Sequence, residues 1–285
     1  MKCKWCGSDK VIRYGSRGMK QLWRCKSCKR YFYFGLKREK KKASLVFNYS
    51  LGYVIGVLMG DGSLSRWKDY HHFDEKGRQV PKSRAIRTVP RYRYGFQLQC
   101  KDEDFALTFA KHLQIVTNRK PCVYSISRRM TVIAGNPLQR PYIFYGFAVR
   151  LTCKEWYFKL KPLIEDLSWI RNSNSELKKG FLRGLFDSDG SVIVRKGTCR
   201  AEITLTNKDE KLILLTRDLL KDLGINSHIY RYPEILKLYI GTKEDVMKFY
   251  KIVGFSIKRK LEKISSVLRT KHYSGDFSTP HHEIP

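Results

Sequence analysis

Two stretches of this chain share one pattern, and that pattern decides the fold. Residues 51 to 64 read Leu-Gly-Tyr-Val-Ile-Gly-Val-Leu-Met-Gly-Asp-Gly-Ser-Leu, and residues 178 to 192 read Lys-Lys-Gly-Phe-Leu-Arg-Gly-Leu-Phe-Asp-Ser-Asp-Gly-Ser-Val. Each is a short apolar run that ends in Asp-Gly-Ser, and a glycine at that place supplies the left-handed turn that commonly stops a helix. The sequence therefore predicts two equivalent helices, one in each half of the chain.

Small residues recur at every fourth position of both predicted helices. They are Gly52, Gly56 and Gly60 in the first helix and Gly180, Gly184 and Ser188 in the second. Residues four apart lie on the same helix face, and small side chains let two backbones approach closely. We expect the two helices to pack along these faces, which would bring Asp61 and Asp189 to one point.

Two carboxylates at neighbouring helix C-termini are unfavourable for stability alone. Each opposes the helix dipole by roughly 0.3–1 kcal/mol, and the two charges repel one another. A turn after a buried helix would explain a single Asp-Gly pair, but two pairs at equivalent places favour a divalent-metal site. Carboxylates, backbone carbonyls and water suit Mg²⁺, so the predicted ligands are Asp61, Asp189 and the carbonyls of Gly60 and Ser188.

The segments that follow the two helices are also repeated. Leu98-Gln-Cys-Lys-Asp-Glu103 matches Leu205-Thr-Asn-Lys-Asp-Glu210, and a third pair of strand-to-helix units begins at Leu151 and Leu238. Each half is therefore predicted to run helix, two strands, helix, two strands, helix. The first half carries an extra polar segment near residues 68 to 90, which has too many charges to be core.

The segments Val54-Ile-Gly-Val-Leu-Met-Gly-Asp-Gly62 and Leu182-Arg-Gly-Leu-Phe-Asp-Ser-Asp-Gly190 resemble the signature of LAGLIDADG homing endonucleases, in the single-chain form with two motifs. The resemblance spans about residues 49 to 270. Its first copy has Met59 where an acid is usual but keeps Asp61. It implies an α+β fold in which two pseudo-symmetric αββαββα halves form a saddle over DNA.

The resemblance also implies helper residues at the active sites. The family uses a basic residue near each site, and Lys258 matches its place in the second half, with Lys260 as the alternative. In the first half three residues compete for that role, namely Lys159, Lys161 and Arg171.

Members of the family often carry Gln or Asn just before the Lys that ends the second strand. Asn207 fits this position, whereas the first half has Cys100, which cannot orient water as an amide does. The resemblance thus implies unequal sites that cut one DNA strand faster. The predicted catalytic residues are Asp61, Asp189, Lys258 and Asn207.

The charge of the chain points to a polyanionic partner. It has 57 Lys and Arg against 26 Asp and Glu, a net charge of +31, which excludes an ordinary metabolic-enzyme surface and favours nucleic acid. Alternation along residues 91 to 101 and 200 to 208 separates an apolar face from a polar face that could read bases in the major groove. A merely solvated face is the alternative, but it would usually mix acids among the bases. The predicted DNA-contacting residues are Arg91, Arg93, Gln97, Gln99 and Lys101 in the first half, and Arg200, Glu202, Thr204, Thr206 and Lys208 in the second; Tyr92, Ala201, Ile203 and Leu205 are predicted to face inward.

Four cysteines near the N-terminus have metal-ligand spacing. Cys3, Cys6, Cys25 and Cys28 form C-x2-C-x18-C-x2-C, which is typical of two knuckles that bind one structural Zn²⁺. A disulfide pair in a secreted protein is the alternative, and the lysine-rich chain without a leader disfavours it. Residues 3 to 32 resemble the zinc ribbons of some transposases, which implies tethering to DNA.

The predicted organisation is a zinc ribbon at 1–34, a basic linker at 35–48, LAGLIDADG halves at 49–172 and 173–272, and a tail at 273–285. The N-terminus lacks the apolar core of a signal peptide, and no run approaches the roughly 18 apolar residues of a membrane span. An intracellular protein that is not secreted is therefore expected.

The favoured hypothesis is a monomeric, Mg²⁺-dependent double-strand DNA endonuclease of intron homing, acting on a long asymmetric target site. Two alternatives stay open. One is an intron-encoded maturase that uses the same scaffold on intron RNA, and the other is a DNA-binding regulator that does not cleave. Retention of both Asp-Gly helix ends favours cleavage.

Overall fold

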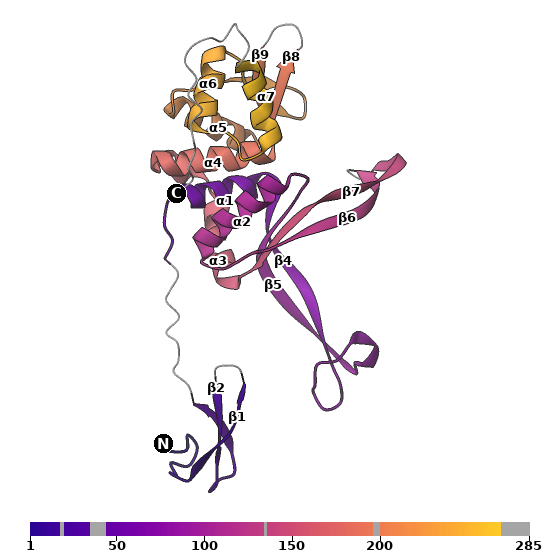
Figure 1. The fold of residues 1–285 in the computed structure, drawn as a ribbon, viewed down its shortest axis with the longest axis vertical. Helices are drawn as coiled ribbons and strands as arrows, with labels where there is room; N and C mark the ends of the chain where they lie inside the picture. Colours follow the sequence, from indigo (N-terminus) through magenta and orange to yellow (C-terminus); the bar gives the residue numbers. More distant parts are fainter. Residues whose placement is uncertain (18–19, 35–43, 134–135, 196–199, 269–285) are drawn as a thin grey trace. The chain divides into compact units, whose positions relative to one another are not determined.

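The computed structural model describes residues 1–17, 20–34, 44–133, 136–195 and 200–268. It divides the chain into two compact units, Met1–Ser44 and Leu45–Pro285 (Figure 1). Most of the predicted basic linker and all of the predicted tail, 273–285, lie outside the described residues. Among the described helices, none has the length and apolar character that a membrane span requires.

The first unit is a small antiparallel sheet. Its strands β1 (Val11–Arg17), β2 (Lys20–Cys25) and β3 (Tyr31–Phe34) lie in the order β1-β2-β3. One face of the sheet packs on a core of Cys3, Cys25 and Phe32, with Val11, Trp23 and Cys28 around it. The fold of this unit thus depends on the cysteines as much as on apolar side chains.

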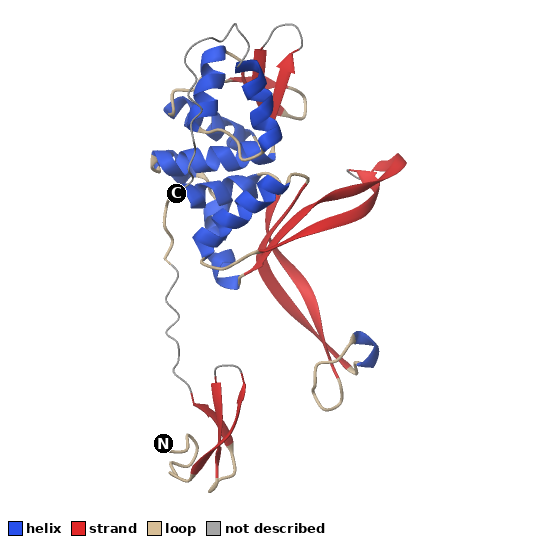
Figure 2. Ribbon diagram, in the orientation of Figure 1, coloured by secondary structure: helices blue, strands red, loops and turns tan. Residues whose placement is uncertain are grey.

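The second unit contains two halves of the same element order (Figures 1 and 2). The first half consists of α1 (Tyr49–Met59), β4 (Gly62–Phe73), β5 (Arg87–Cys100), α2 (Glu103–Thr117), β6 (Cys122–Ile133), β7 (Asn136–Thr152) and α3 (Lys154–Glu165). After a short 3-10 helix, η2 (Ser168–Asn172), the second half consists of α4 (Ser175–Ser188), β8 (Gly190–Arg195), β9 (Arg200–Asn207), α5 (Glu210–Asp222), β10 (His228–Arg231), β11 (Leu236–Ile240) and α6 (Lys243–Ile252), with α7 (Lys258–Leu268) added. The sheet orders β4-β5-β7-β6 and β8-β9-β11-β10 correspond strand for strand. The predicted αββαββα pair is therefore confirmed.

Helices α1 and α4 pack side by side along their small residues (Figure 1). A methyl group added at Gly52 or Gly56 would overlap a backbone carbonyl of α4, and one added at Gly180 or Gly184 would overlap a carbonyl of α1. The reciprocal contact confirms the predicted packing and gives the two halves their pseudo-twofold relationship. Because larger side chains would separate the helices, the glycines fix how closely their ends approach.

The two sheets differ greatly in the length of their strands. The first-half strands β4, β5, β6 and β7 have 12, 14, 12 and 17 residues, whereas β8, β9, β10 and β11 have 6, 8, 4 and 5. Only Gly95–Cys100 of β5 pairs with β7, while β5 stays paired with β4 from Leu98 out to Arg87. The polar segment near residues 68 to 90 is thus the outer part of a two-stranded ribbon, whose tip contains the 3-10 helix η1 (Lys82–Arg84). Figure 1 shows this ribbon and the β6–β7 ribbon extending from the helical body of the unit.

Candidate active site

The C-terminal ends of α1 and α4 meet, and each end carries one predicted metal-binding aspartate. Gly60 caps α1 and is followed by Asp61, while Asp189 itself caps α4. A methyl group at Gly60 would lie 3.2 Å from Oδ1 of Asp189, so the carboxylate of one half sits beside the backbone that holds the other. The structure therefore brings Asp61, Asp189, Gly60 and Ser188 together.

The electrostatics of this acid pair suit a cation. Burial raises the pKa of Asp61. Burial and then the neighbouring Asp61 charge raise the pKa of Asp189. Asp61 is exposed and Asp189 is half-buried. Two neighbouring carboxylates that repel one another are the donor set that a hard divalent ion such as Mg²⁺ neutralises. The residues present thus fit the predicted metal.

Lys260, the alternative helper residue, is the lysine that lies at the acid pair. Only 4% of its surface is exposed, and its Nζ donates hydrogen bonds to the carbonyl oxygens of Phe186 at 2.8 Å and Asp187 at 2.6 Å. Burial lowers the pKa of Lys260 to about 8, and its charge lowers the pKa of both Asp61 and Asp189.

Lys258, the favoured helper in the sequence, points elsewhere. It is exposed, and its backbone amide donates to the Asp104 carboxylate at 2.6 Å. The helical phase explains the difference, because Lys260 shares a face of α7 with buried Ile264 and Val267, four and seven residues further on. The spacing of Ile264 and Val267 from Lys260 could have shown from the sequence that Lys260 lies on the buried face of the helix.

The two halves differ at the position two residues after Leu98 and Leu205, which pair with the motif glycines Gly62 and Gly190. In the second half Asn207 donates from its side-chain amide to Oδ2 of Asp189 at 3.1 Å. In the first half the same position is the buried thiol of Cys100.

The Cys100 thiol cannot replace that amide. Its Sγ lies 3.3 Å from the Asp102 carbonyl oxygen, to which it donates. Burial, followed by the charges of Asp102 and Asp61, raises the pKa of the Cys100 thiol to about 12. The first site therefore has a neutral thiol in place of an amide donor.

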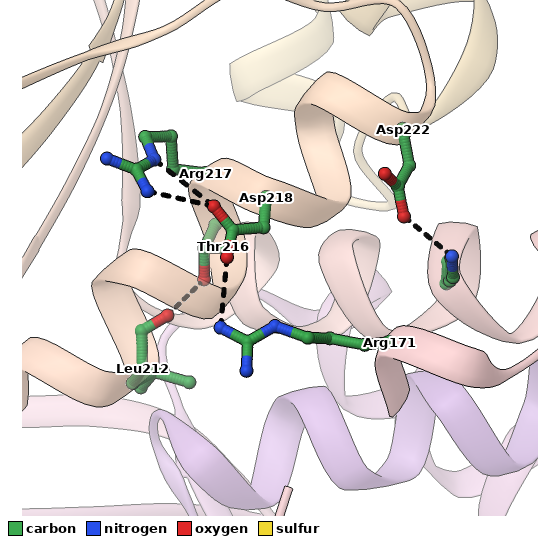
Figure 3. A network of polar contacts seen from close by, with 7 residues as sticks. Arg171, Leu212, Thr216, Arg217, Asp218 and Asp222 are labelled. Carbon is green, nitrogen blue, oxygen red and sulfur yellow. Dashed lines mark hydrogen bonds and ion pairs between the residues drawn. The ribbon is translucent and has the colours of Figure 1, made fainter. Parts of the chain in front are cut away.

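The three first-half basic candidates are engaged in ion pairs outside the acid pair. Lys159 pairs with Glu155 at 3.4 Å and Lys161 pairs with Glu165 at 3.3 Å. Arg171 reaches from η2 to Asp218 of α5 at 2.9 Å, where Arg217 also binds the same carboxylate (Figure 3). The first two ion pairs lie within α3, and the Arg171 pair reaches the second half, so these contacts give none of the three a role at Asp61.

Asp187 was not among the residues predicted from the sequence, but its hydrogen bonds stabilise the backbone next to the acid pair. Its carboxylate is buried and accepts hydrogen bonds from the Tyr53 hydroxyl at 2.8 Å, the Ser256 amide at 2.9 Å and the Ser256 hydroxyl at 2.6 Å. Burial raises its pKa. Because Asp187 thereby links α4, α1 and the segment before α7, it fixes the backbone carbonyl on which Lys260 is anchored.

The predicted DNA-facing side chains of β5 are accessible. Phe96, Leu98 and Cys100 are buried, Gln97 is half-buried, and the exposed residues are Gln99, Lys101, Arg91 and Arg93. Arg93 forms an ion pair with Asp69 of β4 at 2.6 Å. Tyr92 was expected to face inward but is exposed, because β5 has left the sheet at that point and runs in the ribbon.

The prediction for β9 was wrong at two positions. Ala201, Ile203 and Leu205 face inward as expected, and Arg200, Thr206 and Lys208 are exposed. Glu202 and Thr204, however, are buried. Both lie on an interior strand, where Ile193 of β8 pairs with Glu202 and Tyr239 of β11 pairs with Thr204, so the larger neighbours cover them.

The four N-terminal cysteines form one cluster that suits Zn²⁺. All four Sγ atoms lie within 4.8 Å of one another, with Cys3 and Cys28 at 3.6 Å and Cys6 and Cys25 also at 3.6 Å. Zn–S bonds of about 2.3 Å in a tetrahedron require a sulfur separation of about 3.8 Å. A backbone hydrogen bond from Cys28 lowers the pKa of Cys25 to about 6, whereas burial and the neighbouring thiols raise the pKa of Cys6 to about 12.

Comparison with known proteins gives relatives for most of the chain. The family model described as LAGLIDADG-like domain matches residues 176–254. One uncharacterized protein of Methanocaldococcus jannaschii is 36% identical over 237 residues, which cover 77% of this chain and 72% of the relative. A second is 24% identical over 196 residues, 68% of this chain and 61% of the relative. The probable cell division protein WhiA of Thermotoga maritima is 37% identical over 97 residues, 34% of this chain and 32% of WhiA.

Two examples of solved structures with a similar fold are given by the following proteins. The homing endonuclease I-DmoI in complex with DNA and Mn is 18% identical, with a TM-score of 0.47 over 73% of this chain and 98% of that chain. Full-length WhiA from Thermotoga maritima is 19% identical, with a TM-score of 0.45 over 82% and 63% of the two chains. Together with two glycine-lined helices that end in Asp61 and Asp189, the sequence matches show that this chain belongs to the LAGLIDADG family.

Proposed function

We propose that this protein is a site-specific endonuclease that cuts both strands of duplex DNA by hydrolysis of phosphodiester bonds. The observation that carries the proposal is the meeting of Asp61 and Asp189 at the paired ends of α1 and α4, where a methyl group added at Gly60 would lie 3.2 Å from Oδ1 of Asp189. The buried cation of Lys260 acts on both acids. A purely structural helix pair gains no stability from two adjacent acids that repel one another at helix C-termini.

The residues of this site have different proposed roles. Asp61, Asp189 and the carbonyls of Gly60 and Ser188 would hold Mg²⁺, which when bound activates water and stabilises the charge that develops on phosphate oxygens. Asn207 fixes the orientation of the Asp189 carboxylate through its 3.1 Å hydrogen bond. The charge of Lys260 lowers the pKa of both acids, and its Nζ closes the last turn of α4 through the carbonyls of Phe186 and Asp187.

The proposed substrate is a long, asymmetric DNA site. The inner strand β5 has 14 residues and β9 has eight, so at about 3.3 Å per residue they extend about 46 Å and about 26 Å. Duplex DNA rises 3.4 Å per base pair, and these lengths correspond to about 14 and about 8 base pairs. We therefore expect the first half to contact the longer half-site.

Both aspartates come from one chain, so a monomer in the compartment that holds its target DNA suffices for the proposed reaction. A site of such length is rare in a genome. Cutting at a rare site is the activity that homing of an intron requires, and we propose that biological role.

Selection of cleaved sequences from a random DNA library in Mg²⁺ tests the activity. We expect a single long site to be enriched and cut on both strands. Asp61→Asn and Asp189→Asn should each abolish double-strand cleavage while a gel-shift assay in Ca²⁺ still detects binding to that site. Unaltered cutting by either variant would refute the assignment of the acid pair.

A DNA-binding role without cleavage is the second candidate. It is favoured by the incomplete first site, which has Cys100 in place of an amide and no lysine equivalent to Lys260 among its ion-paired candidates. The same selection decides between them, because a regulator would enrich bound sequences and leave all of them intact. The maturase alternative predicts tight binding of structured intron RNA in place of duplex DNA.

A further inference from the structure

The three-stranded sheet of the first unit has one covered face and one open face. The register pairs Arg13 with Trp23 and Trp23 with Phe32, and the Trp23–Phe32 side packs against the cysteine core. Alternation along the strands places Tyr31 and Tyr33 on the opposite side. Within the described part of the first unit no helix or second sheet covers that side, and Tyr31 and Tyr33 are exposed.

Aromatic rings and cations gather on and beside this open face. Tyr14, Tyr31, Tyr33 and Trp5 each expose between 44% and 56% of their surface. The rings of Tyr14 and Tyr31 lie edge to face with centroids 4.7 Å apart, and the Trp5 indole donates to the Tyr31 carbonyl at 3.4 Å.

Three cations lie over these rings. The Arg24 guanidinium is 5.6 Å from the centroid of Tyr31, while Arg30 and Lys4 are each 5.7 Å from Trp5. A guanidinium stacked on a ring keeps its N–H groups free for phosphate.

The fold of the unit does not need these exposed rings, since its core is made by the cysteines, Phe32, Trp23 and Val11. An exposed aromatic patch on a small unit marks an interaction surface. Residues 1 to 44 contain 15 Lys and Arg against two acidic residues, a net charge of +13. The partner must therefore be a polyanion that also offers flat aromatic faces, which is a nucleic acid.

We propose that Tyr14, Tyr31, Tyr33 and Trp5 form a stacking platform for unpaired bases of a single-stranded nucleic acid, with Arg24, Arg30 and Lys4 on its phosphates. In a duplex the base faces are covered by neighbouring bases, whereas in a single strand they can stack on protein rings. The platform goes beyond the proposed cleavage of duplex DNA, because it recognises a different form of nucleic acid and lies on a different unit from the acid pair.

Fluorescence anisotropy with the full-length, zinc-loaded protein tests the platform. The probes are a labelled 12-nucleotide oligo(dT) and a labelled 12-base-pair duplex, in the same salt. The double variant Tyr14→Leu/Tyr31→Leu keeps apolar bulk but loses both rings, and we expect its Kd for the single strand to rise roughly tenfold or more, as loss of base stacking predicts. Tyr14→Phe/Tyr31→Phe should stay within about twofold of the unaltered protein, and the Kd for the duplex should change little in either variant.

Matched controls keep the result interpretable. Phe158→Leu removes a ring that is equally exposed on α3 of the second unit and should leave both affinities unchanged. Trp5 lies outside the strands of the sheet, so Trp5→Leu reports on stacking even if the double variant loses its zinc and fails to fold. Asp189→Asn should lose cleavage but bind oligo(dT) with unchanged affinity. A failure of the nuclease proposal can therefore be told apart from a failure of the platform proposal. Single-strand affinity that persists in Trp5→Leu and in a zinc-loaded Tyr14→Leu/Tyr31→Leu variant would overturn the platform, as would an equal loss of duplex affinity.

Discussion

The side-chain amide of Asn207 donates to the Asp189 carboxylate at 3.1 Å, whereas Cys100 at the equivalent first-half position turns its thiol to the Asp102 carbonyl. The halves thus share a backbone but differ in the side chain beside each acid, which is Asn207 in the second half and Cys100 in the first. An amide can hold a carboxylate or a water molecule by donating N–H, while a buried thiol of high pKa is a weak donor.

Cys100→Asn should accelerate cleavage of the slower DNA strand by about three- to tenfold, because it restores an amide beside Asp61. The unaltered protein should accumulate a nicked intermediate, and the variant should accumulate less of it. Time courses on a duplex labelled at both 5′ ends measure the two strands separately. Asn207→Cys is the matched change in the other half, and it should slow the opposite strand; equal rates on both strands in the unaltered protein would contradict the argument.

Lys260→Met should lower the rate of cleavage by about 10²–10³-fold, the magnitude for removal of one preorganised charge from a reaction centre. The buried ammonium of Lys260 caps the carbonyls of Phe186 and Asp187 and carries positive charge beside the acids. Single-turnover kinetics with saturating protein measures the effect.

Lys258→Met is the matched control, since Lys258 lies two residues away on the exposed side of the same helix. It should retain cleavage within about threefold. Urea unfolding of both variants shows whether a loss arises from the fold. The reverse ranking of the two lysines would restore Lys258 as the helper residue.

A buried histidine should make the second unit sensitive to acid. Burial lowers the pKa of His112 to about 4, and its Nδ1 lies 3.0 Å from the Ser50 hydroxyl while its ring packs on Tyr53 with centroids 4.5 Å apart. The unfolded chain binds a proton at this residue near pH 6.5. The neutral ring therefore contributes stability that is complete above about pH 6.5 and is lost as the pH falls toward 4.

The expected loss is on the order of 3 kcal/mol between pH 6.5 and pH 4, because folding lowers the pKa of His112 from 6.5 to about 4. Urea unfolding at pH 4.5 and pH 7 measures it. His112→Gln should be less stable at pH 7 but should show a smaller difference between the two pH values, since the group that takes up the proton is gone. A variant with the full pH dependence would assign the effect to other residues.

The repeat and the helix contact could be predicted from sequence because they depend on local spacing. Glycines four apart define a helix face wherever the helix lies, and that alone placed Asp61 near Asp189. The choice between Lys258 and Lys260 needed the phase of α7, which the sequence carries through apolar residues such as Ile264 and Val267.

The burial of Glu202 and Thr204 could not be predicted in this way, because it is set by which residues of β8 and β11 lie opposite them. Strand pairing is a long-range property, and alternation along one strand does not contain it. For the same reason the sequence identified residues 68 to 90 as polar but not as a paired ribbon.

Zinc should be required for the fold of the first unit and not for the chemistry of the second. The core of the first unit contains the cysteines and few large apolar side chains, too little to stay folded without a metal. Cys3→Ser/Cys6→Ser should therefore bind no zinc and lose affinity for DNA by about tenfold or more, while cleavage at saturating protein persists. Metal analysis and cleavage titrations measure this, and full affinity with unchanged site choice in the zinc-free variant would require another role for the unit.

Shortening the β4–β5 ribbon should shrink the DNA footprint on one side of the cleavage position only. Lys68 and Tyr92 are directly paired, so replacement of residues 69–91 by Asn-Gly joins them through a two-residue turn that fits a hairpin. The change removes five paired residues of β4, about 17 Å at 3.4 Å per residue, or about five base pairs. Hydroxyl-radical footprinting should show protection lost over that length on the side contacted by the first half, with the scissile phosphates unchanged because the acid pair is intact. A footprint that shortens equally on both sides, or that keeps its full length, would mean that the ribbon does not follow the DNA.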